Sequence, residues 1–285
     1  MLRTVTTDAG TFNAEVAGPD DGPLVLFLHG YPQSRHTWRT QQPALAAAGS
    51  LTVAIDQRGY SPGVRPDPRK LSNYHVDALV GDVIAVAGAL GYGETRPLHL
   101  VGHDWGGAVA WLVADRHPGA VRSLTVLSRP HPRAFRAAMH ADADGQRHRS
   151  RHHRAFHDPA TAGLLLENDA ARLRRGLLDN GVPADATDAY LSVLGSPEAL
   201  EAALAWYRAA GTISELDAAD IEVPTLYLWG ENDQSVGRAA AEGTQAHVSA
   251  AYRFVEVAGG GHFLTDDHPE VVTRELLAHL TAHGA

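Results

Sequence analysis

The six residues from Gly102 to Gly107, with the sequence Gly-His-Asp-Trp-Gly-Gly, constrain the fold more than any other stretch of this chain. An apolar run at 98–101 leads into them, and a run of small residues at 108–114 leads out. This pattern predicts a strand, a sharp turn and a helix. Residues without a Cβ allow a positive φ at the centre of such a turn and a close approach of the two backbones.

The central residue of the turn is Asp104, and its carboxylate suggests a particular chemistry. A carboxylate is already ionised at neutral pH, so it can attack an sp³ carbon directly and form an alkyl ester. Water would then attack the ester carbonyl in a second step. The alternative is an Asp that only caps a helix N-terminus, but capping requires neither the flanking glycines nor the neighbouring Trp105.

A second motif, His-Gly-Tyr-Pro at 29–32, follows the continuous apolar run 24–28, which is typical of a strand buried on both faces. The loop after such a strand can supply an amide to an oxyanion hole. We expect the amides of Tyr31 and Trp105 to be the two donors. An ordinary strand-to-helix turn would also contain Gly and Pro.

Strand and helix patterns alternate between residues 24 and 127, which predicts a mostly parallel, doubly wound α/β sheet. Strands are expected at 2–7, 11–17, 24–28, 51–55, 98–101, 121–127, 224–229 and 252–257, and helices at 34–48, 73–90, 108–114 and 266–282. No good strand pattern occurs at 131–215, so we expect a helical cap there. The core would comprise residues 1–130 and 216–285.

Two further residues follow later strands at the edge where open α/β sheets bind ligands. Asp233 comes after the apolar run that ends at Trp229, and His262 follows three glycines after the last strand. A base that activates water needs a side chain to orient it, so His262 is the predicted base and Asp233 the predicted orienting acid. Glu231 is the rival acid.

The composition excludes several function classes. The 285 residues are 44% hydrophobic and 20% charged, as expected for a globular protein with one large core. A net charge of −9 argues against nucleic acid or an anionic membrane as partner. The chain contains no cysteine, no signal-peptide pattern and no apolar run of transmembrane length, so we expect a cytoplasmic protein. No pattern indicates a cofactor or an oligomeric state.

These motifs resemble the α/β-hydrolase superfamily over nearly the whole chain, and its epoxide hydrolase and haloalkane dehalogenase branch in particular. The resemblance implies that Asp104, Asp233 and His262 are nucleophile, acid and base. Trp206-Tyr207-Arg208 is similar to a cap segment of epoxide hydrolases, in which a tyrosine donates a hydrogen bond to the epoxide oxygen. Tyr207 takes that role by resemblance, and Trp206 is expected to contact substrate.

The chain departs from this family at one cap position. These enzymes generally use two cap tyrosines, and the first lies just before a segment similar to residues 156–159. That position holds Ala155, and Tyr190 is the only other tyrosine of the predicted cap. Two phenols can share the developing alkoxide charge, so a replacement is needed. His153 or His157 could provide it, and His153 is therefore an expected substrate-binding residue.

The cap histidines also permit a metal site. His148 and His152 are four residues apart, as are His153 and His157, so each pair can share a helix face. That spacing can bind zinc. No carboxylate pattern accompanies the pairs, however, and the arginines at 147, 149, 151 and 154 make the segment cationic. A solvated basic face is therefore the favoured interpretation, and no metal is predicted.

The sequence thus predicts a cofactor-independent hydrolase that acts on a small apolar organic substrate. The favoured reaction is the opening of an epoxide to a vicinal diol. Dehalogenation of a haloalkane with the same triad is the first alternative, with the Trp105 indole as a halide donor; such enzymes often carry an Asn where this chain has Tyr31. A binder of small apolar ligands that lacks hydrolytic activity is the second alternative.

Overall fold

The computed structural model describes residues 1–210 and 216–284. Its sheet has the strand order β1-β2-β4-β3-β5-β6-β7-β8. The strands are β1 (Leu2–Thr7), β2 (Gly10–Ala17), β3 (Leu24–Leu28), β4 (Leu51–Ile55), β5 (Leu98–His103), β6 (Val121–Leu127), β7 (Thr225–Gly230) and β8 (Tyr252–Val257). Only the pairings of β2 with β1 and β4 are antiparallel. The predicted mostly parallel, doubly wound sheet is confirmed.

Helices cover both faces of this sheet, as the uninterrupted apolar strands require. Alternate residues of β3 point to opposite faces. Leu26 belongs to one buried cluster with residues of α2 and α3, and Phe27 to another with residues of α1 and α12. These helices are α1 (Gln41–Ala47), α2 (Val76–Ala89), α3 (Trp105–Arg116) and α12 (Pro269–Ala282).

Two predicted helices are interrupted near a proline. The helix expected at 34–48 is a 3₁₀ turn, Arg35–Trp38, followed by α1, which has Pro43 in its first turn. The helix expected at 266–282 is divided into α11 (Leu264–Asp267) and α12, which begins at Pro269. Proline lacks an N–H and its ring clashes with the preceding turn, so it favours a helix start over a helix interior.

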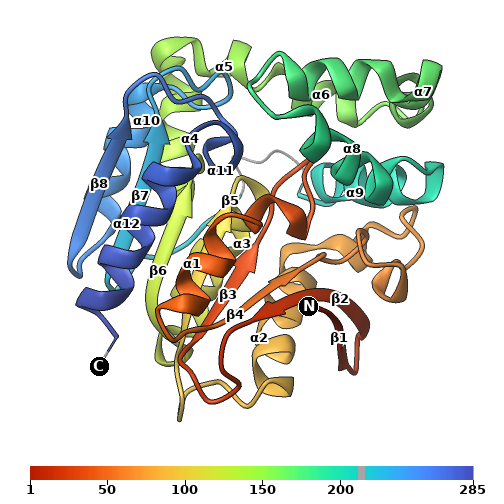
Figure 1. Ribbon diagram of the computed structural model, residues 1–285. Coiled ribbons are helices and arrows are strands. Elements are labelled where there is room, and N and C mark those ends of the chain that lie inside the picture. Colours follow the sequence, from red (N-terminus) through yellow and green to blue (C-terminus); the bar gives the residue numbers. More distant parts are fainter. Residues whose placement is uncertain (211–215, 285) are drawn as a thin grey trace.

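A block of helices lies between β6 and β7 in the sequence. They are α4 (Pro132–Ala141), α5 (Gln146–Arg149), α6 (Arg151–Phe156), α7 (Thr161–Leu178), α8 (Ala184–Leu194) and α9 (Pro197–Ala209). Helices α6 to α9 gather across one end of the sheet (Figure 1). The last residues of the expected cap, 211–215, lie outside the described residues. Between β7 and β8 the chain forms α10 (Arg238–Gly243).

Helix α8 is tied to the sheet domain by a buried polar cluster. The Tyr190 hydroxyl donates to the Asp266 carboxylate, at 2.8 and 2.9 Å from its two oxygens. Arg39 also pairs with Asp266, at 2.7 Å. Tyr190 is therefore committed to holding α8 and takes no part in lining the cavity. Within the described residues, no helix combines the length and apolarity needed to cross a membrane.

Candidate active site

The turn between β5 and α3 has the strained geometry that its sequence predicts. Asp104 has φ 50° and ψ −116°, outside the regions that most side chains adopt. A Cβ on Gly102 would lie 2.4 Å from the carbonyl oxygen of Gly106, and one on Gly106 would lie 2.3 Å from that of Leu28. The Asp104 side chain makes no capping hydrogen bond to α3. The carboxylate is therefore directed away from the helix, and the capping alternative is wrong.

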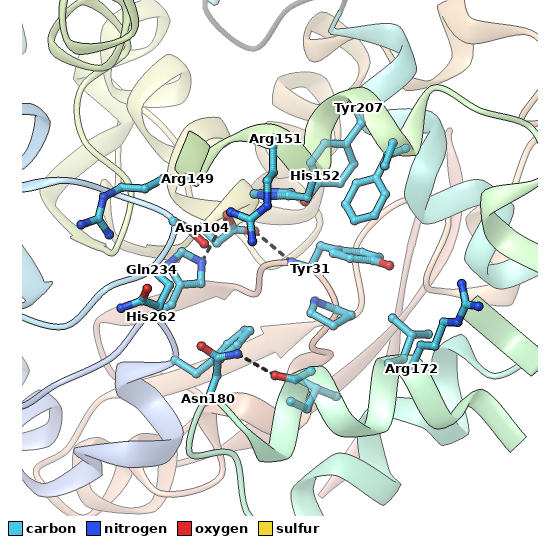
Figure 2. Close-up of a pocket in the computed structure, with 18 of the residues that line it drawn as sticks. Tyr31, Asp104, Arg149, Arg151, His152, Arg172, Asn180, Tyr207, Gln234 and His262 are labelled. Atoms are coloured by element: carbon cyan, nitrogen blue, oxygen red, sulfur yellow. Dashed lines mark hydrogen bonds and ion pairs between the residues drawn. The ribbon is translucent and has the colours of Figure 1, made fainter. Parts of the chain in front are cut away.

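The loops after β7 and β8 bring Asp233 and His262 to this turn. The Nδ1 atom of His262 lies 2.9 Å from Oδ2 of Asp233, and its Nε2 atom lies 3.6 Å from Oδ2 of Asp104. Figure 2 shows the His262 ring beside Asp104 at the cavity wall. The rival acid, Glu231, instead accepts the Gly259 N–H at the protein surface.

Backbone donors and neighbouring side chains fix these groups in place. Oδ1 of Asp233 accepts the N–H groups of Ser235 at 2.7 Å and Val236 at 3.0 Å. The carbonyl oxygen of His262 accepts the Ser128 hydroxyl at 2.8 Å and lies 2.8 Å from Nε2 of His103. Asp233 thus orients the imidazole, while Ser128 and His103 fix the backbone carbonyl of His262.

Asp104 and His262 also influence each other's protonation. Burial lowers the pKa of His262, but the charges of Asp233 and Asp104 outweigh burial and raise it above its usual range. Burial raises the pKa of Asp104, but its hydrogen bond and ion pair with His262 outweigh burial and lower it. An ionised Asp104 therefore faces a protonated His262.

One of the two predicted oxyanion donors contacts Asp104. The Tyr31 N–H donates to Oδ1 of Asp104 at 3.0 Å. The Trp105 amide, at the first position of α3, makes no hydrogen bond to Asp104 within the described residues. The Trp105 amide stays a predicted donor to the oxyanion that would form when water attacks an ester of Asp104.

A cavity of about 1060 Å³ opens above the carboxylate. Its wall includes Asp104, His262, Tyr31, Tyr207, His152 and Phe156. Tyr207 extends from α9 toward the cavity (Figure 2). Its ring packs edge-to-face against Trp105 with centroids 5.1 Å apart. Burial raises the pKa of Tyr207 well above its usual value, so the hydroxyl keeps its proton and can act as a donor.

Other cap residues lie differently from the sequence expectation. Trp206 does not line this cavity, because its indole turns away and donates to the Arg58 carbonyl at 3.0 Å. His153 is likewise outside the lining, although its ring lies 5.3 Å from that of Tyr207. Neither expected substrate contact is therefore supported. Ala155 does line the cavity, without a hydroxyl to offer.

Sequence reasoning missed His152, which lines the cavity one residue before the favoured His153. Burial lowers the pKa of His152 to about 4, so its ring is neutral at pH 7. The expectation that His148 and His152 share one helix face is wrong, because Ser150 separates α5, which carries His148, from α6, which carries His152. His148 also lines the cavity. The described residues contain no group of three or more His, Cys, Asp or Glu side chains that could hold a metal.

Known proteins resemble this chain over most of its length. The family described as "alpha/beta hydrolase fold" matches residues 23–269. Epoxide hydrolase 3 of Xenopus tropicalis is 32% identical over 273 residues, covering 92% of this chain and 72% of the relative. Human epoxide hydrolase 4 is also 32% identical, with 92% and 74% covered. The crystal structure of a Bacillus megaterium epoxide hydrolase with an inhibitor has a TM-score of 0.88 at 26% identity, with 98% and 100% covered.

Proposed function

The chain is an epoxide-hydrolase-like member of the α/β-hydrolase fold family, and we propose that it opens epoxides to vicinal diols through an ester on Asp104. The observation that carries this proposal is the cavity-facing carboxylate at the turn, 3.6 Å from a histidine that Asp233 orients. A carboxylate in this position suits attack on a strained sp³ carbon. Family membership supports a hydrolase over the non-hydrolytic binder.

In the first step, an oxygen of Asp104 attacks one epoxide carbon and the carbon–oxygen bond breaks. The electron pair of that bond moves to the epoxide oxygen, which takes a proton from the Tyr207 hydroxyl. Because Ala155 offers no second phenol, we expect the neighbouring His152 to share the developing charge. This arrangement is supported by the cavity lining, to which all three side chains contribute.

In the second step, water cleaves the ester. Ester formation removes the negative charge of Asp104, which is one of the two charges that raise the pKa of His262. The imidazole then loses its proton, which restores the Tyr207 hydroxyl, and becomes a base. It takes a proton from water, and the hydroxide attacks the ester carbon of Asp104. The Tyr31 amide holds the oxyanion, and collapse of the intermediate breaks the bond from the ester carbon to the substrate oxygen. That oxygen takes the proton of the new carboxyl group, which releases the diol and leaves Asp104 ionised beside the protonated His262.

Trapping of the ester tests this mechanism. The variant His262→Gln lacks the base for the second step, so incubation with phenyl glycidyl ether should leave an adduct. Intact-protein mass spectrometry should find the mass of the whole epoxide added, and peptide mapping should place it on Asp104. The wild type should release the diol and carry little adduct.

Matched variants separate the roles in the first step. In the His262→Gln background, Asp104→Asn should abolish the adduct, whereas Tyr207→Phe and His152→Leu should slow its formation by roughly 10²-fold and 10-fold respectively. Glu231→Gln, which removes the rival acid, should change nothing. The proposal fails if wild-type protein makes no diol from any of a panel of epoxides, or if the adduct maps elsewhere.

Dehalogenation is a second candidate, favoured by one observation. Nε1 of Trp105, the residue after the nucleophile, is buried and makes no hydrogen bond of standard geometry among the described residues, although it interacts with the Tyr207 hydroxyl. An indole N–H can bind a leaving halide. The trapping experiment with 1-bromohexane distinguishes this reaction, because the adduct would weigh the haloalkane less hydrogen bromide.

A further inference from the structure

Three arginines line the cavity, and they differ in what they bind. Arg149 donates to the backbone oxygens of Asp144 at 3.0 Å and Asp233 at 2.6 Å. Arg151 makes one hydrogen bond, to the His148 carbonyl at 2.9 Å. Arg172 has no hydrogen bond or ion pair within the described residues. The guanidinium groups of Arg151 and Arg172 therefore retain most of their donor capacity.

The chain has 33 acidic residues against 24 basic ones, and several of its other arginines pair with carboxylates. Arg174, two residues after Arg172 on the same helix, pairs with Asp188 at 2.5 Å, and Arg58 binds both oxygens of Asp82. At the cavity wall, Arg151 and Arg172 form no ion pair with an acidic side chain among the described residues.

The acidic side chains of the cavity wall form no ion pair with Arg151 or Arg172 among the described residues. Asp104 accepts the Tyr31 amide and pairs with His262. Asp144 accepts the Ala239 N–H at 2.6 Å and forms no ion pair with an arginine side chain among the described residues, so it remains a second negative charge at the cavity. Arg151 and Arg172 are both exposed and without a carboxylate partner among the described residues, beside an apolar wall that includes Phe156.

We propose that the preferred substrate is an epoxide that carries a carboxylate, held by Arg151 and Arg172; this inference rests on the proposed function. A guanidinium matches a carboxylate in shape and charge, with two parallel N–H···O bonds. A singly charged carboxylate adds less repulsion with Asp104 than a phosphate dianion would. The net charge of −9 would otherwise repel an anion, so a local cationic site is needed.

The side chains come from two different helices. Figure 2 shows Arg151 extending from the wall that carries His152 toward the centre of the cavity, and Arg172 on the far side of Tyr31. Arg151 is on α6 and Arg172 is on α7. With the epoxide ring between Asp104 and Tyr207, the proposal places the carboxylate farther along the cavity, between the two arginines.

A pair of substrates that differ only in charge tests the proposal. These are 4-(oxiran-2-ylmethoxy)benzoate and 4-(oxiran-2-ylmethoxy)benzamide. At low salt and pH 7.5, wild-type kcat/KM should be about tenfold or more higher for the benzoate, and 0.5 M NaCl should reduce this preference. In the double variant Arg151→Gln/Arg172→Gln, the benzoate-to-benzamide ratio should fall toward one, and the matching lysine variant should retain part of it.

Two control variants lie three residues farther along the same helices and do not line the cavity. Arg154→Gln and Arg175→Gln remove one positive charge each and should keep the wild-type ratio. Equal wild-type rates on both substrates, or an equal loss of the ratio in the control variants, would overturn the carboxylate site while the proposed function stands. If wild-type enzyme hydrolyses neither these nor neutral epoxides, the proposed function fails, and this inference with it.

Discussion

A buried cation lies behind the catalytic turn. Arg129 follows β6, and only 4% of its surface is exposed. Its Nε and Nη2 atoms have no hydrogen-bond partner among the described residues, and its guanidinium carbon lies 4.6 Å from the centre of the Phe135 ring. Burial lowers the pKa of Arg129, while the charge of Asp104 opposes that shift. The burial of this charge lowers the free energy of unfolding, whereas its attraction to Asp104 stabilises negative charge on that carboxyl group.

We therefore predict opposite effects on stability and activity for Arg129→Met. Removal of an incompletely paired buried charge should leave the free energy of unfolding unchanged or raise it by about 1–2 kcal/mol. The activity, kcat, should fall about tenfold, because the oxyanion formed on Asp104 loses a nearby positive charge. Urea denaturation and steady-state kinetics measure both. A loss of several kcal/mol with unchanged kcat would mean that Arg129 is structural.

At the residue scale, the sequence predicts the positions of those functional side chains that have glycines beside them. Asp104 and His262 stand in Gly-rich turns after buried strands, and these turns have only a few possible conformations. Arg129 and His152 lack such a signal. The surroundings of His152 depend on α9, which is distant in sequence. Arg129 packs on Phe135 of α4, the helix that follows it directly, but nothing in this short stretch indicates that the guanidinium is buried. Charge and spacing alone therefore could not distinguish them from exposed residues.

At the scale of elements, the join between β5 and α3 is the least tolerant part of the fold. The close approach at Gly102 involves backbone atoms, which cannot rotate aside. We predict that Gly102→Ala lowers the free energy of unfolding by about 3 kcal/mol, because strand and helix must separate. Denaturant titration followed by circular dichroism measures the loss.

The control is a glycine in a helix with open space around it. A Cβ on Gly81, inside α2, would meet nothing within 4 Å. Gly81→Ala should therefore raise the free energy of unfolding by about 0.5–1 kcal/mol, since alanine loses less backbone entropy on folding. Equal effects of the two substitutions would contradict the close-approach argument.

Elements of the sheet could be predicted from the sequence, and those of the inserted helices could not. The central strands are continuous apolar runs bounded by Gly and Pro. Helices α5 and α6 are short, polar and largely exposed, so they lack an apolar stripe. Asp144 and Gly145 adopt positive φ just before α5 begins, and no Pro marks this boundary in the sequence. The positions of the inserted helices depend on contacts with the sheet domain, such as that of Tyr190 on α8 with Asp266.

At the scale of the whole molecule, buried neutral histidines determine the response to acid. Burial lowers the pKa of His99, His131 and His279 to about 4. Between pH 6.5 and 4 the unfolded chain binds protons that the folded chain does not, so stability is full above pH 6.5 and decreases as the pH falls. The loss is at most on the order of 3 kcal/mol for each group by pH 4.

The free energy of unfolding from urea titrations at pH 7.5 and 5.0 checks this prediction. His99→Gln keeps a polar partner for Ser123, which lies 2.7 Å from Nδ1 of His99, and should reduce the difference between the two pH values. His140→Gln changes an exposed histidine and should preserve the difference. An unchanged difference in His99→Gln would argue against the assignment.

The inserted helices lie in the sequence between β6 and β7, and these two strands are direct neighbours in the sheet. A change of length or sequence in this insertion leaves the hydrogen-bonded register of the strands intact. The residues that carry out bond breaking can therefore stay fixed while lineages, or a laboratory library confined to α5–α9, exchange one cavity wall for another and select new molecules to cleave.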